Sequence, residues 1–147
     1  MRRVALTASA IAIAALTIGV AQEKPDFSGT WTLVGEAGKR STTTMVVTQY
    51  AESMMLEVTA RGKDTARYVF PLVAIPSGDA APPMAGSVSR ATWEGVKLVL
   101  STSSPDGARV LRQVWSLVDG DLVVTLSEIN QATSAVLRET KQTFRKG

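Results

Sequence analysis

Short runs of alternating apolar and polar residues fill the chain after residue 21. Thr, Val, Leu and aromatic residues dominate these runs, and Gly, Asp, Ser and Pro separate them. Alternation with a period of two residues is typical of β-strands with one buried face. The pattern predicts nine strands, at 27–34, 42–50, 53–61, 65–72, 87–93, 97–103, 108–118, 121–129 and 134–146.

The connections between these predicted strands are short. They include "RGKD" at 61–64, "SPDG" at 104–107 and "DGD" at 119–121. Such turns favour antiparallel pairing of neighbouring strands. A closed sheet leaves no exposed edge, whereas a two-sheet sandwich would need longer crossovers. We therefore predict an all-β fold, an eight- to nine-stranded antiparallel up-and-down barrel.

The first 21 residues have the pattern of a signal peptide. Arg2 and Arg3 precede an apolar run over 4–20, and the small residues Gly19 and Ala21 suit a cleavage site. The alternative, a retained membrane anchor, is disfavoured because the run is short for a span. We predict a signal peptide at 1–21, a single domain at 22–147, no stable membrane insertion after cleavage, and a periplasmic or secreted protein.

Charge and composition remove several classes of function. The 16 basic residues include Arg2 and Arg3, and none of the 13 acidic residues lies in the leader, so the mature chain carries 14 − 13 = +1. This balance gives no reason to expect nucleic acid binding. The chain has no His and no Cys, which excludes a thiolate nucleophile, a Ser-His-Asp triad and the usual zinc ligands. We expect no enzymatic activity, no metal and no cofactor.

Three short motifs carry a resemblance to a known group of barrels. "SGTW" at 28–31 resembles the Gly-x-Trp signature in the first strand of the calycins, which comprise lipocalins, fatty-acid-binding proteins and avidins. The mature chain is also similar to small exported lipocalin-like proteins of bacteria. In those proteins "DFSGTW" follows the signal peptide, and hairpins such as "WEGVKLV" (93–99) and "WSLVDG" (115–120) come later.

The resemblance implies a structural role for the first motif. Family members place a basic side chain over the Trp of the first strand, in a cation–π contact that closes the base of the barrel. We therefore expect Trp31 at the base, with Arg145 over its ring and Arg112 as the alternative. Gly29 would leave space where another part of the chain passes closely.

A candidate ligand site lies on the strand at 87–93. Ser87, Ser89 and Ala91 are small residues on the same face as Trp93, and would leave volume beside an aromatic ring if that face points inward. The opposite orientation would put Val88 inside and is equally compatible with the pattern. Further along the chain, Arg109 and Gln113 share one strand face and are candidates to supply polar contacts, although the alternative, an Arg at the barrel rim that reaches solvent, is favoured.

These residues leave two main hypotheses of function. The first is a carrier that holds a small, mostly apolar ligand in the barrel mouth. The second is a filled barrel that acts as an exported protein-interaction module, either an enzyme inhibitor or an envelope component. The long apolar loop at 73–86 is compatible with a lid, with a docking surface or with a disordered excursion. The hypotheses differ in whether the barrel is hollow, which depends on strand register.

Overall fold

The computed structural model describes residues 23–35, 38, 40–61, 63–73 and 88–147. The predicted signal peptide and most of the loop at 73–86 lie outside these residues. The described chain forms nine strands, which confirms the number expected from the sequence, and each strand begins and ends within two residues of its predicted boundary. They are β1 (Gly29–Val34), β2 (Arg40–Gln49), β3 (Ser53–Thr59), β4 (Ala66–Pro71), β5 (Ser89–Glu94), β6 (Lys97–Ser103), β7 (Arg109–Val118), β8 (Asp121–Asn130) and β9 (Val136–Lys146).

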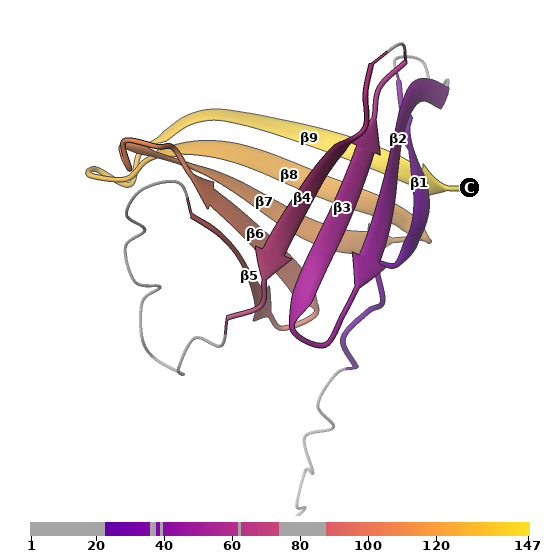
Figure 1. Cartoon of the computed structure of the whole chain (residues 1–147), viewed down its shortest axis with the longest axis horizontal. Coiled ribbons are helices and arrows are strands. Elements are labelled where there is room, and N and C mark those ends of the chain that lie inside the picture. The colour runs from indigo at the N-terminus through magenta and orange to yellow at the C-terminus, as the bar shows by residue number, and fades with distance from the viewer. Residues whose placement is uncertain (1–22, 36–37, 39, 62, 74–87) are drawn as a thin grey trace, which may run out of the picture.

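All nine strands belong to one strongly curved sheet (Figure 1). Its order is β4-β3-β2-β1-β9-β8-β7-β6-β5, and each neighbouring pair in this order is antiparallel. Each strand therefore lies beside its neighbours in sequence, and pairing of β1 with β9 joins the two ends of the chain. The predicted all-β antiparallel barrel is confirmed.

The two edges of the sheet, β4 and β5, meet at a parallel junction. Leu72 and Ala91 form a parallel bridge there, and the Val73 amide donates to the Ala91 carbonyl at 2.8 Å. If all nine strands alternated in direction along the chain, β1 and β9 would run the same way. Because β1 and β9 pair antiparallel, another junction in the closed sheet must be parallel. Parallel strands cannot be joined by a tight turn, because the chain must return to the end at which the first strand began. This requirement explains the length of the connection between Leu72 and Ser89.

The β7–β8 hairpin shows how the sequence fixes strand register. Its turn residues Asp119 and Gly120 both have positive φ, at 52° and 82°. An Asp-Gly pair favours this two-residue turn, whose twist matches that of the flanking strands. Val118 consequently pairs with Asp121, and the register continues along the hairpin to Arg109 and Asn130. The turn thus determines which residues of two long strands face inward.

Aromatic side chains fill one end of the barrel. Phe27 is fully buried, stacks on Trp93 with ring centroids 6.0 Å apart, and meets Trp115 edge-on at 5.7 Å. The Trp31 indole N–H donates to the Phe27 carbonyl at 2.9 Å, so this buried polar group is satisfied. Buried Leu98 belongs to the same core cluster. This closed end is the base of the barrel.

Candidate functional site

A cavity of about 370 Å³ lies in the barrel interior, next to the aromatic base. Such a volume falls within the range of small-molecule sites in proteins, roughly 300–1,000 Å³. Its apolar wall includes Met45, Leu56, Phe70, Trp115 and Phe144, all of which are buried. These residues come from β2, β3, β4, β7 and β9, so strands from around the barrel converge on one space.

The polar part of the cavity wall consists of uncharged groups. They come from six residues, Thr43, Tyr68, Ser89, Thr102, Gln113 and Gln142. Among the described residues that line the cavity, none carries a formal charge. An uncharged and mainly apolar wall favours a ligand whose enclosed part is also uncharged, because a buried ion without a partner is costly.

Three of these polar residues already have hydrogen-bond partners in the cavity wall. The Trp115 indole N–H donates to the Gln113 side-chain oxygen at 3.1 Å. The Ser89 and Thr102 hydroxyl oxygens lie 3.2 Å apart on the neighbouring strands β5 and β6. The Gln113 amide group of the predicted site therefore has a partner for its oxygen, and its NH₂ group provides donors on the cavity wall.

The structure places some residues of the predicted ligand site in the cavity wall and others elsewhere. Ser89 and Gln113 line the cavity, whereas Ser87 lies outside the described residues. Trp93 stacks its ring on Phe27 at the base and is not part of the cavity wall, so its contact with a ligand stays a prediction. The Ala91 side chain is fully buried in the core, so the strand face that carries it points inward, but Ala91 is not part of the cavity wall and its backbone forms the β4–β5 junction.

The arrangement of the base also corrects one prediction. The cation over Trp31 is Lys146, with its Nζ 5.6 Å from the ring centroid, rather than Arg145. Along β9 Phe144 and Lys146 share a face, and alternation turns Arg145 outward, where its Nε lies 3.9 Å from an oxygen of Asp121. The alternative, Arg112, forms an ion pair with Glu94 at 3.2 Å.

Gly29 and Lys146 fit closely together at this base. A Cβ atom at Gly29 would lie 3.0 Å from the Lys146 Cε, and the φ angle of Gly29 is +140°. The predicted close passage of another part of the chain over Gly29 thus corresponds to the Lys146 side chain. A second cation, the Lys24 Nζ, lies 5.4 Å from the ring centroid of Trp93.

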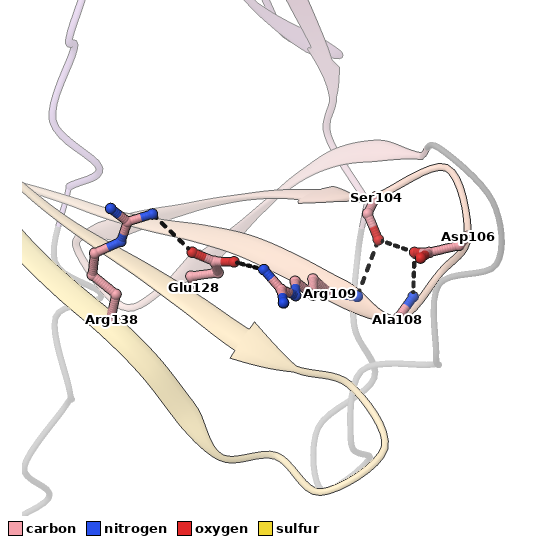
Figure 2. Close-up of polar contacts among 6 residues, drawn as sticks. All are labelled: Ser104, Asp106, Ala108, Arg109, Glu128 and Arg138. Atoms are coloured by element: carbon pink, nitrogen blue, oxygen red, sulfur yellow. Dashed lines mark hydrogen bonds and ion pairs between the residues drawn. The ribbon is translucent and has the colours of Figure 1, made fainter.

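Arg109 lies at the rim of the barrel, outside the cavity. Its guanidinium Nη1 is 2.7 Å from Glu128 Oε1, and the other Glu128 oxygen is 3.2 Å from Arg138 Nη2 (Figure 2). The pKa of Glu128 is lowered from its ordinary value by the hydrogen bond from Arg138 and then by that from Arg109. We call these three residues, Arg109, Glu128 and Arg138, the rim cluster.

A tight turn fixes the start of the strand that carries Arg109. The Ser104 hydroxyl donates to Asp106 at 2.6 Å and accepts from the Arg109 amide at 3.1 Å, while the Ala108 amide donates to Asp106 at 2.9 Å (Figure 2). The hydrogen bonds from Ser104 and Ala108 lower the pKa of Asp106. The "SPDG" turn therefore positions the backbone of Arg109 as well as connecting two strands.

The sequence interpretation missed Trp115, Tyr68 and Gln142 as cavity residues. The signal was available for Trp115, since it shares a strand face with Gln113. Tyr68 and Gln142 are harder to identify, because the distance across a barrel between strands remote in sequence is not contained in either strand's pattern.

Within the described segments, no helix is long and apolar enough to cross a membrane, and no group of three metal-ligating side chains occurs.

Comparisons with known proteins support the fold. No family model and no curated protein sequence matches the chain. Among solved structures, it is similar to the fluorescent protein UnaG, with a TM-score of 0.55 and 20% sequence identity over 82% of this chain and 97% of that chain. It is also similar to a secretory abundant heat soluble protein from Ramazzottius varieornatus, with a TM-score of 0.57 and 12% identity over 86% of this chain and 98% of that chain. Likeness at these identities establishes a shared β-barrel fold.

Proposed function

We propose that this protein is a non-catalytic carrier that binds one small, mostly apolar molecule inside its barrel. The observation that carries the proposal is the cavity of about 370 Å³ beside Trp115, within a barrel closed at one end by aromatic side chains. Burial of apolar ligand surface against this wall would provide the driving force for binding. The polar groups of Gln113 and Ser89 would orient the ligand.

The proposal includes the cellular context expected from the sequence. A leader with the features of a signal peptide supports export, and hence a periplasmic or secreted carrier. The lipocalin-like resemblance of the motifs at Trp31, Trp93 and Trp115 supports the same reading. An exported carrier without cysteines would keep its fold under oxidising or reducing conditions, because no disulfide is involved.

Titration with a neutral naphthylamine dye, whose fluorescence rises in apolar surroundings, tests the carrier proposal. The wild type should bind one dye per chain. Val58 lines the cavity, so Val58→Trp should place an indole in the space and weaken dye binding at least about tenfold, equivalent to ~1.4 kcal/mol. The matched control is Val69→Trp on β4, because Val69 is 52% exposed and is not part of the cavity wall.

The same variants separate a hollow barrel from a filled one. In a hollow barrel Val58→Trp leaves the free energy of unfolding nearly unchanged, whereas overpacking of a filled core costs about 1–3 kcal/mol. Failure of the wild type to bind dye, or equal weakening by Val58→Trp and Val69→Trp, would contradict the carrier proposal. The filled-barrel interaction module would then be the better account.

A further inference from the structure

The sheet is incompletely joined between β4 and β5. Within the part of the chain that the structure describes, these strands stand at the two ends of the strand order, and one isolated bridge, Leu72 with Ala91, joins them in place of a ladder of pairs. The two strands diverge from this bridge (Figure 1). The four residues 66–69 of β4 are all exposed, although their side chains alternate between the inner and outer faces. The edge of β4 that faces β5 is therefore open along these residues.

Two hydrogen bonds show which backbone groups of β4 face this open edge. The Leu72 amide donates to the Glu52 carbonyl on the side of β3, whereas the Val73 amide donates to the Ala91 carbonyl on the side of β5. Backbone groups of successive residues in a strand point to opposite sides, so residues two apart point the same way. The odd-numbered residues of β4 therefore direct their backbone groups toward β5.

Arg67 and Val69 each direct an N–H and a C=O group into the gap by this alternation. On the other side of the gap, the Ala91 carbonyl accepts from Val73, so the backbone groups of Ser89, two residues earlier on β5, point the same way. Open edge groups of this kind are a template for an added strand. The gap therefore offers two donors and two acceptors on β4 alone.

The direction of the flanking strands suits one further strand between them. β4 and β5 run parallel at their bridge, so a strand opposite in direction to β4 is opposite to β5 as well. Such a strand restores the alternation that the rest of the sheet follows, and antiparallel ladders are slightly more stable per residue than parallel ones. Five paired residues along 66–70 would span about 17 Å.

We infer that the open edge of β4 is a docking site for an extended peptide segment of another protein, which adds to β4 as an antiparallel strand. This inference is independent of the carrier function proposed above. Tyr68 lines the cavity and Phe70 is buried, so the peptide residues opposite them should be apolar. On the outer face the Arg67 side chain is 66% exposed and lies 3.7 Å from Glu57, so an acidic peptide residue opposite Arg67 should be favoured.

Amide hydrogen exchange of the free protein, followed by NMR, tests whether the edge is open. The Tyr68 and Phe70 amides point toward β3 and should be protected, whereas those of Arg67 and Val69 should exchange fast. The probe is the end-blocked peptide Ser-Val-Thr-Ile-Glu-Val-Ser, which places its Thr opposite Val69 and its Glu opposite Arg67. Saturation with this peptide should slow exchange at Arg67 and Val69 at least about tenfold.

A modified peptide separates strand addition from other modes of binding. Methyl groups on the backbone nitrogens of its Thr and Glu remove the two donors to β4 and keep every side chain. This peptide should bind at least about tenfold more weakly, as measured by calorimetry on the unaltered protein. A third peptide with Gln in place of Glu should lose affinity for the wild type and none for Arg67→Gln.

A variant of β4 tests the same bonds from the side of the protein. Val69→Pro removes a donor at the open edge and no bond to β3, so the barrel should keep its fold while the peptide binds about fivefold more weakly. Val69→Thr is the matched control, because it keeps the N–H and a β-branched side chain, and its affinity for the peptide should stay within about twofold of the wild type.

Several results would overturn the inference. Equal protection of all four amides in the free protein would mean that the edge is already paired. Protection at Arg67 that rises with protein concentration in the absence of peptide would assign the edge to a second copy of the chain. Equal binding of the methylated and unmethylated peptides, or no binding of either, would exclude strand addition. None of these results bears on dye binding, so the carrier proposal is tested separately.

Discussion

The Lys146 Nζ lies 5.6 Å from the centre of the Trp31 ring, so the end of β9 packs over the ring of a residue on β1. Thr32 strengthens this closure by donating its hydroxyl to the Gly147 carbonyl at 2.8 Å. The contact joins β1 to β9, the pair through which the two halves of the barrel meet. The base of the barrel therefore depends on side chains from both ends of the described chain.

Gly29→Ala should lower the free energy of unfolding by about 1–3 kcal/mol, because residues with a Cβ rarely adopt a φ near +140°. The cost should persist when Lys146→Ala removes the side chain that lies 3.0 Å from the added Cβ. Urea unfolding of the single and double variants measures these free energies of unfolding. Full recovery of stability in the double variant would show that crowding by Lys146, and not backbone strain, is the cause.

Trp31→Ala should cost about 3–5 kcal/mol, as for other truncations of a buried aromatic residue. Trp31 is 2% exposed and its indole N–H is bonded to Phe27, so the substitution removes packing and leaves a buried carbonyl without its donor. The measurement is the denaturant midpoint of the purified variant. A midpoint equal to that of the wild type would be incompatible with Trp31 at the base of the barrel.

Ala91→Phe should destabilise the fold by about 1–3 kcal/mol through overpacking, while the folded fraction still binds the neutral dye. Ala91 is fully buried at the β4–β5 junction and does not line the cavity. Dye affinity and urea unfolding are measured on the same preparation. Loss of dye binding at unchanged stability would instead place Ala91 against the ligand.

The strands and their boundaries were predictable because alternation and turn residues are local properties of the sequence. The Asp119-Gly120 turn, for example, fixes the β7–β8 register by itself. The different positions of the Trp93 and Trp115 side chains were not predictable in the same way. Trp93 and Trp115 both precede Gly-containing turns, but only contacts across the barrel with Phe27 decide that Trp93 seals the base while Trp115 also lines the cavity.

The cation over the Trp31 ring was predicted wrongly for a different reason. Arg145 and Lys146 are adjacent, and alternation from buried Phe144 assigns Lys146 to the inner face. Strict application of the period of two would have identified it. The parallel β4–β5 junction, in contrast, follows only from the pairing of β1 with β9, which joins residues more than a hundred positions apart.

Acidification should weaken the fold partly through Glu128. Its pKa is lowered in the folded state, mainly by Arg138 and then by Arg109, so below its ordinary pKa of 4.5 the unfolded chain binds the proton more readily. The stabilisation from Glu128 is therefore complete above that value and is lost as the pH falls through the lower folded pKa. In urea unfolding across this range, Glu128→Gln should show a smaller loss of stability than the wild type. Identical pH profiles would mean that the rim cluster does not hold Glu128 ionised.

The central claim, that the barrel is hollow and holds its ligand against Trp115, is tested most directly by nuclear Overhauser contacts in the complex with dodecanol. We expect contacts between the dodecanol chain and the indole protons of Trp115, and none to those of Trp93, which packs between Phe27 and Lys24. Trp115→Phe should remove the indole contacts and leave those to Phe144 on the same cavity wall. Contacts to Trp93 without any to Trp115, or dodecanol bound with no contact to either cavity residue, would contradict the account.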